Sequence, residues 1–210
     1  MIEKFIDFKK NESQLEILRR PSPAKSVLFF KEFSKSISSI TGFISKNQSK
    51  KDIEKLLKNT LPESIQRHPF FDVWLEDMNY ICKLFCTFLN ENKLSFWLGS
   101  DRGCKRYHLD MVPFRILVTY EGQGTELLPD YAADKDAFIE GKPNNEIIKD
   151  KSAIKFINKW DIAIFRGGKN GILHRTPDSA SNRHSSILMR LDDSSFLEKI
   201  KKVNEVAERI

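Results

Sequence analysis

The chain has 210 residues, of which 40% are hydrophobic and 30% are charged, a composition typical of a globular protein. No uncharged apolar stretch approaches the roughly 18 residues that a membrane span needs. The N-terminal residues 1–14 mix acids with lysines and lack the apolar segment of a secretory signal. Three cysteines do not make a disulfide framework. We therefore expect a cytoplasmic protein of one domain, residues 1–210, without a membrane segment.

The net charge of +6 comes from the N-terminal part of the chain. Residues 1–60 contain 13 Lys and Arg but 7 Asp and Glu, whereas the remaining 150 residues contain 22 of each. A solvated lysine-rich surface is the favoured interpretation. An interaction module whose basic helices recruit an acidic partner stays open as an alternative. Nucleic acid is not favoured, because no arginines are interleaved with aromatic residues as in RNA-binding sheets.

The first half of the chain predicts helices. Residues 24–45 and 51–59 form two apolar-patterned segments joined by a polar linker, so we expect residues 1–62 to be a basic helical region. Residues 69–93 give the clearest helix, with one apolar stripe at spacings of three and four. The stripe consists of Phe71, Trp74, Met78, Ile81, Phe85 and Phe88. Such an aromatic stripe predicts a helix that packs on a sheet.

The second half predicts short strands. Five runs are rich in aromatic and β-branched residues and are separated by Gly, Pro, Asn and Asp, at 94–99, 105–110, 114–120, 160–167 and 183–192. Residues 194–210 then predict a final helix, which Ser195 and Glu198 begin with a capping box. The order predicts an α+β domain in which residues 63–193 form one helix and a β core.

His108 and Asp110 are candidate metal ligands on one of these runs. Residues two apart on a strand point to the same face with Cα atoms about 6.6 Å apart, so both side chains can converge on one ion. A second histidine would complete a facial triad of two histidines and one carboxylate, which leaves coordination positions open. Taken alone, a histidine two places before an aspartate is a weak signal.

His174 supplies the missing ligand and brings a second motif with it. It follows a strand and a Gly-rich turn, and it lies 66 positions after His108. Arg183 comes nine positions later and Ser185 two positions after that. These two residues share one strand face and could hold a carboxylate, with the arginine binding in a bidentate manner.

This pattern resembles the Fe(II)/2-oxoglutarate-dependent dioxygenase superfamily. The resemblance covers residues 70–191 and implies a double-stranded β-helix, or jelly-roll, core. It implies that His108, Asp110 and His174 hold Fe(II), and that Arg183 and Ser185 hold the distal carboxylate of 2-oxoglutarate. The implied activity is the O2-dependent hydroxylation of a substrate that the sequence does not identify.

A closer resemblance covers most of the chain. The segments CKRYHLD, RILVTYEGQGTELLPD, WDIAIFRG and HRTP, with a later arginine, look like a bacterial family catalogued as a domain of unknown function. Its members are sometimes associated with zinc-homeostasis genes. A non-catalytic jelly-roll protein that binds zinc is therefore the alternative function, and Cys104, four residues before His108, would favour zinc if it approached the metal.

Several candidate positions remain open at this point. Arg175 and Arg190 compete with Arg183 for the cosubstrate carboxylate. Thr119 and Tyr120 end a predicted strand and either bond the cosubstrate or pack in the core.

Other residues depart from the superfamily pattern or have no assigned role. Trp160 stands where the superfamily usually has a glycine, and no role is assigned to Glu121 or Glu126. His68 and His184 are expected at the surface or in the core. Buried thiols are the favoured interpretation for Cys82 and Cys86.

Overall fold

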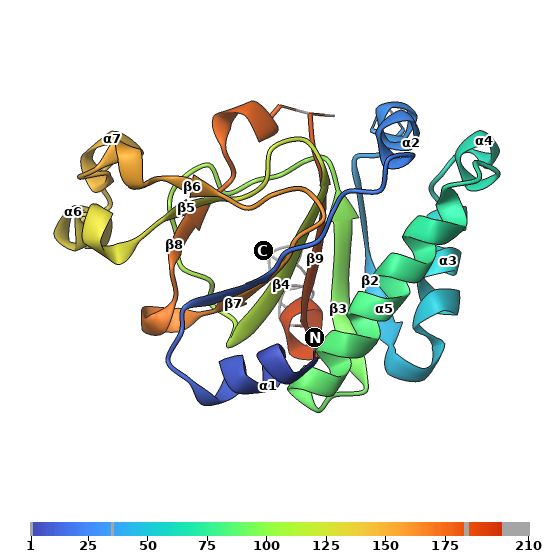
Figure 1. The fold of residues 1–210 in the computed structure, drawn as a ribbon, viewed down its shortest axis with the longest axis horizontal. Coiled ribbons are helices and arrows are strands. Elements are labelled where there is room, and N and C mark those ends of the chain that lie inside the picture. The colour runs from blue at the N-terminus through green and yellow to red at the C-terminus, as the bar shows by residue number, and fades with distance from the viewer. Residues whose placement is uncertain (1, 35, 183–184, 199–210) are drawn as a thin grey trace, which may run out of the picture.

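The computed structural model describes residues 2–34, 36–182 and 185–198. It contains two antiparallel sheets, with helices packed on one face of the larger sheet (Figure 1). The larger sheet has the strand order β1 (Leu15–Leu18), β7 (Ile162–Arg166), β4 (Phe114–Glu121), β9 (Ile187–Asp193), β3 (Lys93–Gly99) and β2 (Ser39–Ser45). The smaller sheet has the order β6 (Lys155–Phe156), β5 (Glu126–Leu128) and β8 (Leu173–Arg175). The expected mixed α+β fold is confirmed at this level.

The helices lie mainly in the first half of the chain and in one connection of the second half. The α-helices are α1 (Ile2–Lys10), α2 (Ser26–Phe33), α3 (Ser49–Lys58), α4 (Glu63–Gln66), α5 (Phe71–Leu89), α6 (Lys135–Ile139) and α7 (Asn144–Ile147). Short 3-10 helices are η1 (Lys46–Gln48), η2 (Asp130–Ala132), η3 (Lys151–Ala153), η4 (Gly168–Asn170) and η5 (Asp178–Ala180). None of the helices in the described ranges is long and apolar enough to cross a membrane.

Helix α5 fulfils the prediction from its aromatic stripe. All six stripe residues are buried, and the helix lies along the outer face of the larger sheet (Figure 1). The helix ends at Asn90, which adopts the left-handed conformation with φ of 61° that often terminates helices. Around Trp74, aromatic rings from α2 and the sheet pack edge to face, including Phe33 at 4.8 Å and Tyr120 at 5.7 Å between ring centroids. This packing fixes the outer face of the sheet.

The N-terminal region was expected to be helical, but it also contains two strands. Residues 39–45 form strand β2, which pairs with β3, and β1 pairs with β7. In β2 the buried side chains of Ile40 and Ile44 alternate with exposed residues, and Gly42 between them lies close to Leu56 of α3. The spacing of the isoleucines suits either a helix or a strand, and pairing with β3 decides between them. The N-terminal region thus supplies both edge strands of the larger sheet.

Four of the five predicted strands are confirmed, as β3, β4, β7 and β9. The fifth run, 105–110, forms no strand and contributes only an isolated bridge, in which the amide groups of His108 and His174 each donate to the other residue's carbonyl. Residues 194–198 begin a helix, and the rest of the predicted C-terminal helix lies outside the described residues.

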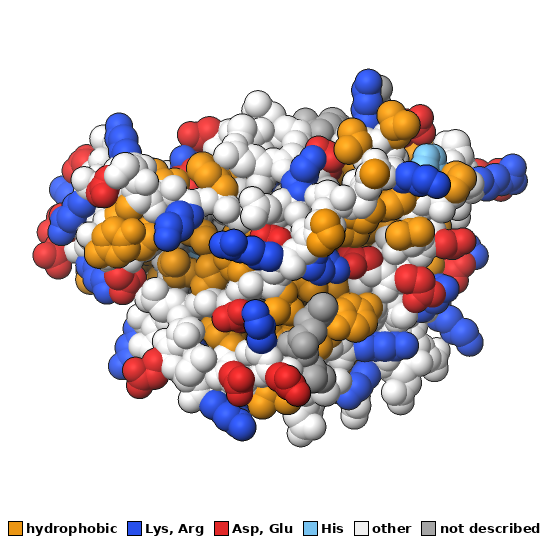
Figure 2. Space-filling model, in the orientation of Figure 1, with side chains coloured by type: hydrophobic (Ala, Val, Ile, Leu, Met, Phe, Trp, Pro, Cys, Tyr) orange, Lys and Arg blue, Asp and Glu red, His pale blue; other side chains and the backbone are white. Residues whose placement is uncertain are grey.

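The space between the two sheets contains a separate apolar cluster and, beside it, the candidate site. Leu117 and Phe165 of the larger sheet pack there with Leu127 of the smaller one. On the molecular face shown in Figure 2, basic and acidic side chains are mixed rather than gathered into a surface of one sign. That face therefore gives no support to recruitment of an acidic partner by the basic N-terminal region.

Candidate metal centre

The structure brings His108, Asp110 and His174 together between the two sheets. One potential ligand atom from each residue lies within 4.8 Å of the other two. The Nε2 atom of His174 is 3.6 Å from Oδ2 of Asp110, and the two imidazole rings have centroids 4.4 Å apart. The bridge between His108 and His174 aligns their backbones, so this proximity follows directly from the sheet pairing.

Hydrogen bonds orient the three side chains toward a common point. Nδ1 of His108 lies 3.1 Å from the carbonyl of Arg106, and Nδ1 of His174 lies 3.0 Å from the carbonyl of Ile172. Because a carbonyl only accepts, each Nδ1 carries the proton and each Nε2 keeps a free lone pair. Within the described chain, Oδ2 of Asp110 is buried and has no hydrogen-bond partner. Two imidazole nitrogens and one carboxylate oxygen fit a transition-metal ion such as Fe(II) or Zn2+.

The Gly-rich turn after β7 holds the Asp110 segment in place. The amide of Gly168 donates to the carbonyl of Asp110 at 2.7 Å, and the amide of Gly167 donates to that of Pro113 at 3.0 Å. A Cβ atom at Gly167 would lie 1.8 Å from the carbonyl oxygen of Val112, so only glycine allows this approach. The glycine is required for backbone contact with the ligand-bearing segment.

Arg115 neutralises the carboxylates behind the candidate centre. Its guanidinium forms ion pairs with Asp110 and with Asp192, the second with a distance of 2.7 Å, and all three side chains are almost completely buried. Burial lowers the pKa of His174 to about 4, which keeps its imidazole neutral. A neutral imidazole is the form that binds metal ions.

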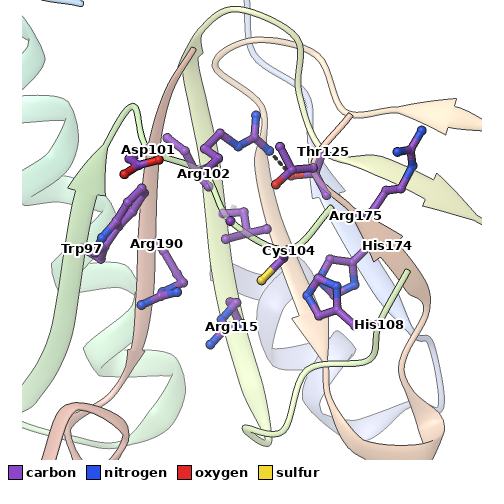
Figure 3. A pocket seen from close by; sticks show the side chains of 14 residues that line it. Trp97, Asp101, Arg102, Cys104, His108, Arg115, Thr125, His174, Arg175 and Arg190 are labelled. Atoms are coloured by element: carbon purple, nitrogen blue, oxygen red, sulfur yellow. Dashed lines mark hydrogen bonds between the residues drawn. The ribbon is translucent and has the colours of Figure 1, made fainter. Parts of the chain in front are cut away.

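A cavity of about 210 Å3 opens beside the three residues. Its walls come from both sheets and from residues 101–108, and four arginines line it: Arg102, Arg115, Arg175 and Arg190. In Figure 3, Trp97 and Arg190 stand on one side and the two histidines on the other, with Cys104 between them. The cavity is therefore basic and adjoins the candidate ligands.

Cys104 lines the cavity beside the centre, but its sulfur is not in the group of candidate ligand atoms that lie within 4.8 Å of one another. The neighbouring His108 side chain lowers the pKa of the thiol. The residue has φ of 59°, a conformation that costs energy for a residue other than glycine. Burial lowers the pKa of His108, but the nearby Cys104, the Arg106 backbone and the Asp110 carboxylate outweigh burial, so the pKa of that imidazole is raised.

The structure gives no contact between the cavity and the residues expected to hold the cosubstrate, as far as they are described. Arg183 lies outside the described residues, as does His184. Ser185 is half-buried, does not line the cavity, and donates its hydroxyl to the carbonyl of Asn182. Thr119 is buried but also does not line the cavity.

The structure corrects the expectation for Tyr120. Its side chain points to the outer face of the larger sheet, where the hydroxyl donates to Oδ2 of Asp77 at 2.9 Å and the ring stacks on Phe30. The strand alternates its faces, so Tyr120 and the cavity-lining Leu117 lie on opposite sides. Tyr120 is therefore a core residue rather than a ligand of the cosubstrate.

Of the two competing arginines, Arg190 retains more donors for a ligand. Arg175 pairs with Glu126 at 2.8 Å and with Asp178 at 2.9 Å. Nε of Arg190 lies 3.2 Å from Asp192, yet in the described part of the chain it makes no hydrogen bond of acceptable geometry. Arg190 on β9 is therefore the better candidate for a carboxylate.

The two glutamates without an assigned role have structural partners. Glu126 accepts hydrogen bonds from the hydroxyl of Tyr107 and from Arg175. Glu121 contacts the ammonium group of Lys159 at 3.2 Å. Neither glutamate lines the cavity.

Outside this centre, the remaining histidine and cysteines of the described chain are in the core or pack against it. His68 stacks on Phe29, and its Nδ1 accepts from the amide of Phe70. Cys82 and Cys86 are buried, as expected.

Sequence reasoning missed several residues of the cavity, among them Arg115 and, most notably, Arg102. It is 4% exposed and donates to the carbonyl of Gln123 at 2.8 Å and to the hydroxyl of Thr125 at 3.1 Å. An isolated arginine in a connection between strands has no periodicity and belongs to no recognised motif. Only the three-dimensional structure reveals its burial.

Comparisons with known proteins identify a family and two remote structural neighbours. The profile of DUF1826, described as a protein of unknown function, matches residues 2–192. No curated protein matched the chain. A bsmA homolog from Methylobium petroleophilum PM1 is similar with a TM-score of 0.43 and 9% identity, over 91% of this chain and 92% of the other. The Fe(II)/α-ketoglutarate-dependent dioxygenase TqaL is similar with a TM-score of 0.44 and 8% identity, over 91% and 86%. With similarity this remote, function must be argued from the residues of this chain.

Proposed function

We propose a function from the site itself, because the chain belongs to the DUF1826 family, whose description names no activity. The proposed activity is that of a 2-oxoglutarate-dependent oxygenase, in which His108, Asp110 and His174 hold Fe(II). One observation carries the proposal: the three side chains converge beside a basic cavity, and the buried Oδ2 of Asp110 points at them without a hydrogen-bond partner in the described chain. Three protein ligands leave positions on a metal ion for other molecules.

The protein's own residues prepare this site for a metal and an anionic cosubstrate. Bound Fe(II) would supply the activation of O2, coupled to the oxidative decarboxylation of 2-oxoglutarate to succinate. The backbone carbonyls behind His108 and His174 keep both rings in one tautomer. Arg115 forms an ion pair with Asp110 and holds its carboxylate in position. The ligands are thus oriented before any metal binds.

Arg190 is the proposed partner of the distal carboxylate of 2-oxoglutarate. It lies on β9, lines the same cavity as the histidines, and has a buried Nε that no hydrogen bond within the described ranges uses. A guanidinium fork binds a carboxylate through two parallel hydrogen bonds. Arg183 and Ser185, which the sequence favoured, stay predictions. The two facing antiparallel sheets with the site between them also fit the proposed jelly-roll core.

Anaerobic titration of the Fe(II)-loaded protein with 2-oxoglutarate tests this proposal. We expect a metal-to-ligand charge-transfer band in the visible spectrum, and succinate formation when O2 is admitted. His174→Ala should remove both signals. His68→Ala is the matched control, because His68 packs against Phe29 away from the cavity, and it should keep both. A wild-type protein that binds Fe(II) but gives neither signal would overturn the proposal.

Cys104 favours a second candidate function, a zinc-binding protein without oxygenase turnover. Its thiol lines the same cavity as His108, which lowers the pKa of the thiol. If Cys104 moved to join His108, Asp110 and His174, whose ligand atoms already lie within 4.8 Å of one another, the four would make a closed zinc site. Metal analysis of protein purified without added iron decides between the two. Tightly held zinc that Cys104→Ser weakens by at least about tenfold, together with no succinate, would support the zinc protein.

A further inference from the structure

Arg102 is a buried cation that has no carboxylate partner in the described chain. Its terminal nitrogens donate to a carbonyl and to the hydroxyl of Thr125, both neutral, and its Nε is buried and makes no hydrogen bond there. Burial lowers the pKa of Arg102 to about 10, and the nearby Cys104 offsets only part of this effect. A buried charge is costly unless an opposite charge accompanies it. The side chain is therefore suited to receive an anion.

Among the described residues, the other three arginines of the cavity each have a carboxylate beside them, unlike Arg102. Arg115 pairs with two aspartates, and Arg175 pairs with a glutamate and an aspartate. Arg190 has Asp192 beside it at 3.2 Å. Arg102 alone of the four forms no ion pair with any described residue, although it is among the most deeply buried. The positive charge at this end of the cavity is thus uncompensated.

Arg102 and Arg190 occupy different parts of the cavity. Arg190 comes from β9, and Asp110 and Arg115 of the metal centre are among the charges that shift its pKa. Arg102 comes from the connection between β3 and β4, and Figure 3 shows its guanidinium beside Thr125, away from Arg190 and Arg115. A dicarboxylate that binds the metal through one end has only one distal carboxylate to offer. One of the two arginines therefore remains for a different ligand.

We propose that Arg102 and Thr125 bind the carboxylate or phosphate group of a small anionic substrate, separate from 2-oxoglutarate. The hydroxyl of Thr125 accepts from Arg102, which leaves its own proton to donate to the anion. The guanidinium fork matches either anion, and a cavity of about 210 Å3 suits a small molecule. The inference rests on the proposed function for the chemistry at the metal, but the anion site itself needs no metal.

Two calorimetric titrations test the anion site separately from the cosubstrate site. Inorganic phosphate and succinate are titrated into metal-free protein, and N-oxalylglycine, an unreactive analogue of 2-oxoglutarate, is titrated into anaerobic Fe(II)-loaded protein. We expect Arg102→Gln to weaken phosphate or succinate binding by at least about tenfold and to change N-oxalylglycine affinity by less than about twofold. Arg190→Gln should show the opposite pattern. The stronger of phosphate and succinate identifies the class of anion.

Control variants separate loss of the site from loss of the fold. Arg106→Gln changes an exposed arginine in the same connection and should leave both titrations unchanged. If Arg102→Gln does not fold, Thr125→Val takes its place, with a similar expected loss of anion binding.

Each unfavourable result has a distinct meaning. The proposed anion site is overturned if neither phosphate nor succinate binds the wild type, or if Arg102→Gln weakens N-oxalylglycine instead. If N-oxalylglycine does not bind the Fe(II)-loaded wild type while phosphate or succinate binding still depends on Arg102, the anion site stands and the oxygenase proposal fails.

Discussion

Arg115 connects the charges of the candidate metal centre to the larger sheet. It sits on β4 between Asp110, which belongs to the centre, and Asp192 of β9. Two carboxylates share one cation, and Arg190 approaches Asp192 from the other side. The position of the Asp110 carboxylate therefore depends on a residue that does not itself bind the metal.

Arg115→Gln should destabilise the metal-free protein by about 3 kcal/mol, because it leaves the buried carboxylate of Asp110 without its cation and that of Asp192 with Arg190 alone. Urea unfolding of metal-free protein measures the change. Lys135→Gln is the control, since the Lys135–Asp130 pair is largely exposed and should contribute less than about 0.5 kcal/mol. Added metal ion should restore part of the loss by pairing with Asp110. A change below about 1 kcal/mol would contradict this account of the network.

Tyr120→Phe tests the reassignment of Tyr120 to the core. The variant loses the hydrogen bond to Asp77 and should cost about 1 kcal/mol of unfolding free energy. The affinity for 2-oxoglutarate should not change, because the side chain faces away from the cavity. Tyr131→Phe, at an exposed position, should affect neither quantity. A tenfold weaker binding of 2-oxoglutarate by Tyr120→Phe would show that the residue reaches the cosubstrate after all.

Among the structural elements, the turn that follows β7 contributes most to the geometry of the site. Its backbone amides bind the carbonyls of Asp110 and Pro113, and Gly167 lies against Val112 with no room for a side chain. Because Gly167 has φ of −99°, the requirement for glycine is one of space and not of backbone conformation.

Gly167→Ala should therefore cost about 3 kcal/mol of stability and also weaken metal binding, since the added methyl group displaces the Asp110 segment. Gly141→Ala is the matched control. Gly141 has φ of +79° and open space around it, so alanine there should cost about 1 kcal/mol through backbone strain and leave metal affinity unchanged. Thermal unfolding and a metal titration of both variants provide the comparison. Equal metal affinity in the two variants would contradict the proposed function of the turn.

The elements also show what the sequence could and could not predict. Helix α5 follows from its periodic apolar stripe, and strands β3, β4, β7 and β9 follow from short apolar runs bounded by turn residues, because these strands are buried on both faces. Strand β2 was missed, since Ile37, Ile40 and Ile44 recur at helical spacing and only pairing with β3 makes the segment extended. The motif located His108 and His174, but nothing local distinguishes Arg102 from an exposed arginine.

At the scale of the whole molecule, the N-terminal region is part of the β core. Its strands β1 and β2 form the two edges of the larger sheet, and α1, α2 and α3 contribute to the same hydrophobic core as α5. The alternative of a basic module that recruits an acidic partner rested on the charge of this region, which differs from that of the rest of the chain. Charge alone, however, reports on the surface and not on which strands pair.

Deletion of residues 1–62 should therefore prevent folding rather than release an intact metal-binding domain. The deletion would remove two of the six strands and expose the outer face of the sheet, including the apolar stripe of α5. The free energy lost with so much buried apolar area exceeds the free energy of unfolding of a domain of this size, which is small. We expect the fragment to show no cooperative thermal transition by circular dichroism and no specific Fe(II) binding. Co-expression with residues 1–62 as a separate chain should restore both, because the missing strands can pair again at the sheet edges. A fragment 63–210 that unfolds cooperatively and binds Fe(II) as the full chain does would show that the N-terminal region is a true appendage.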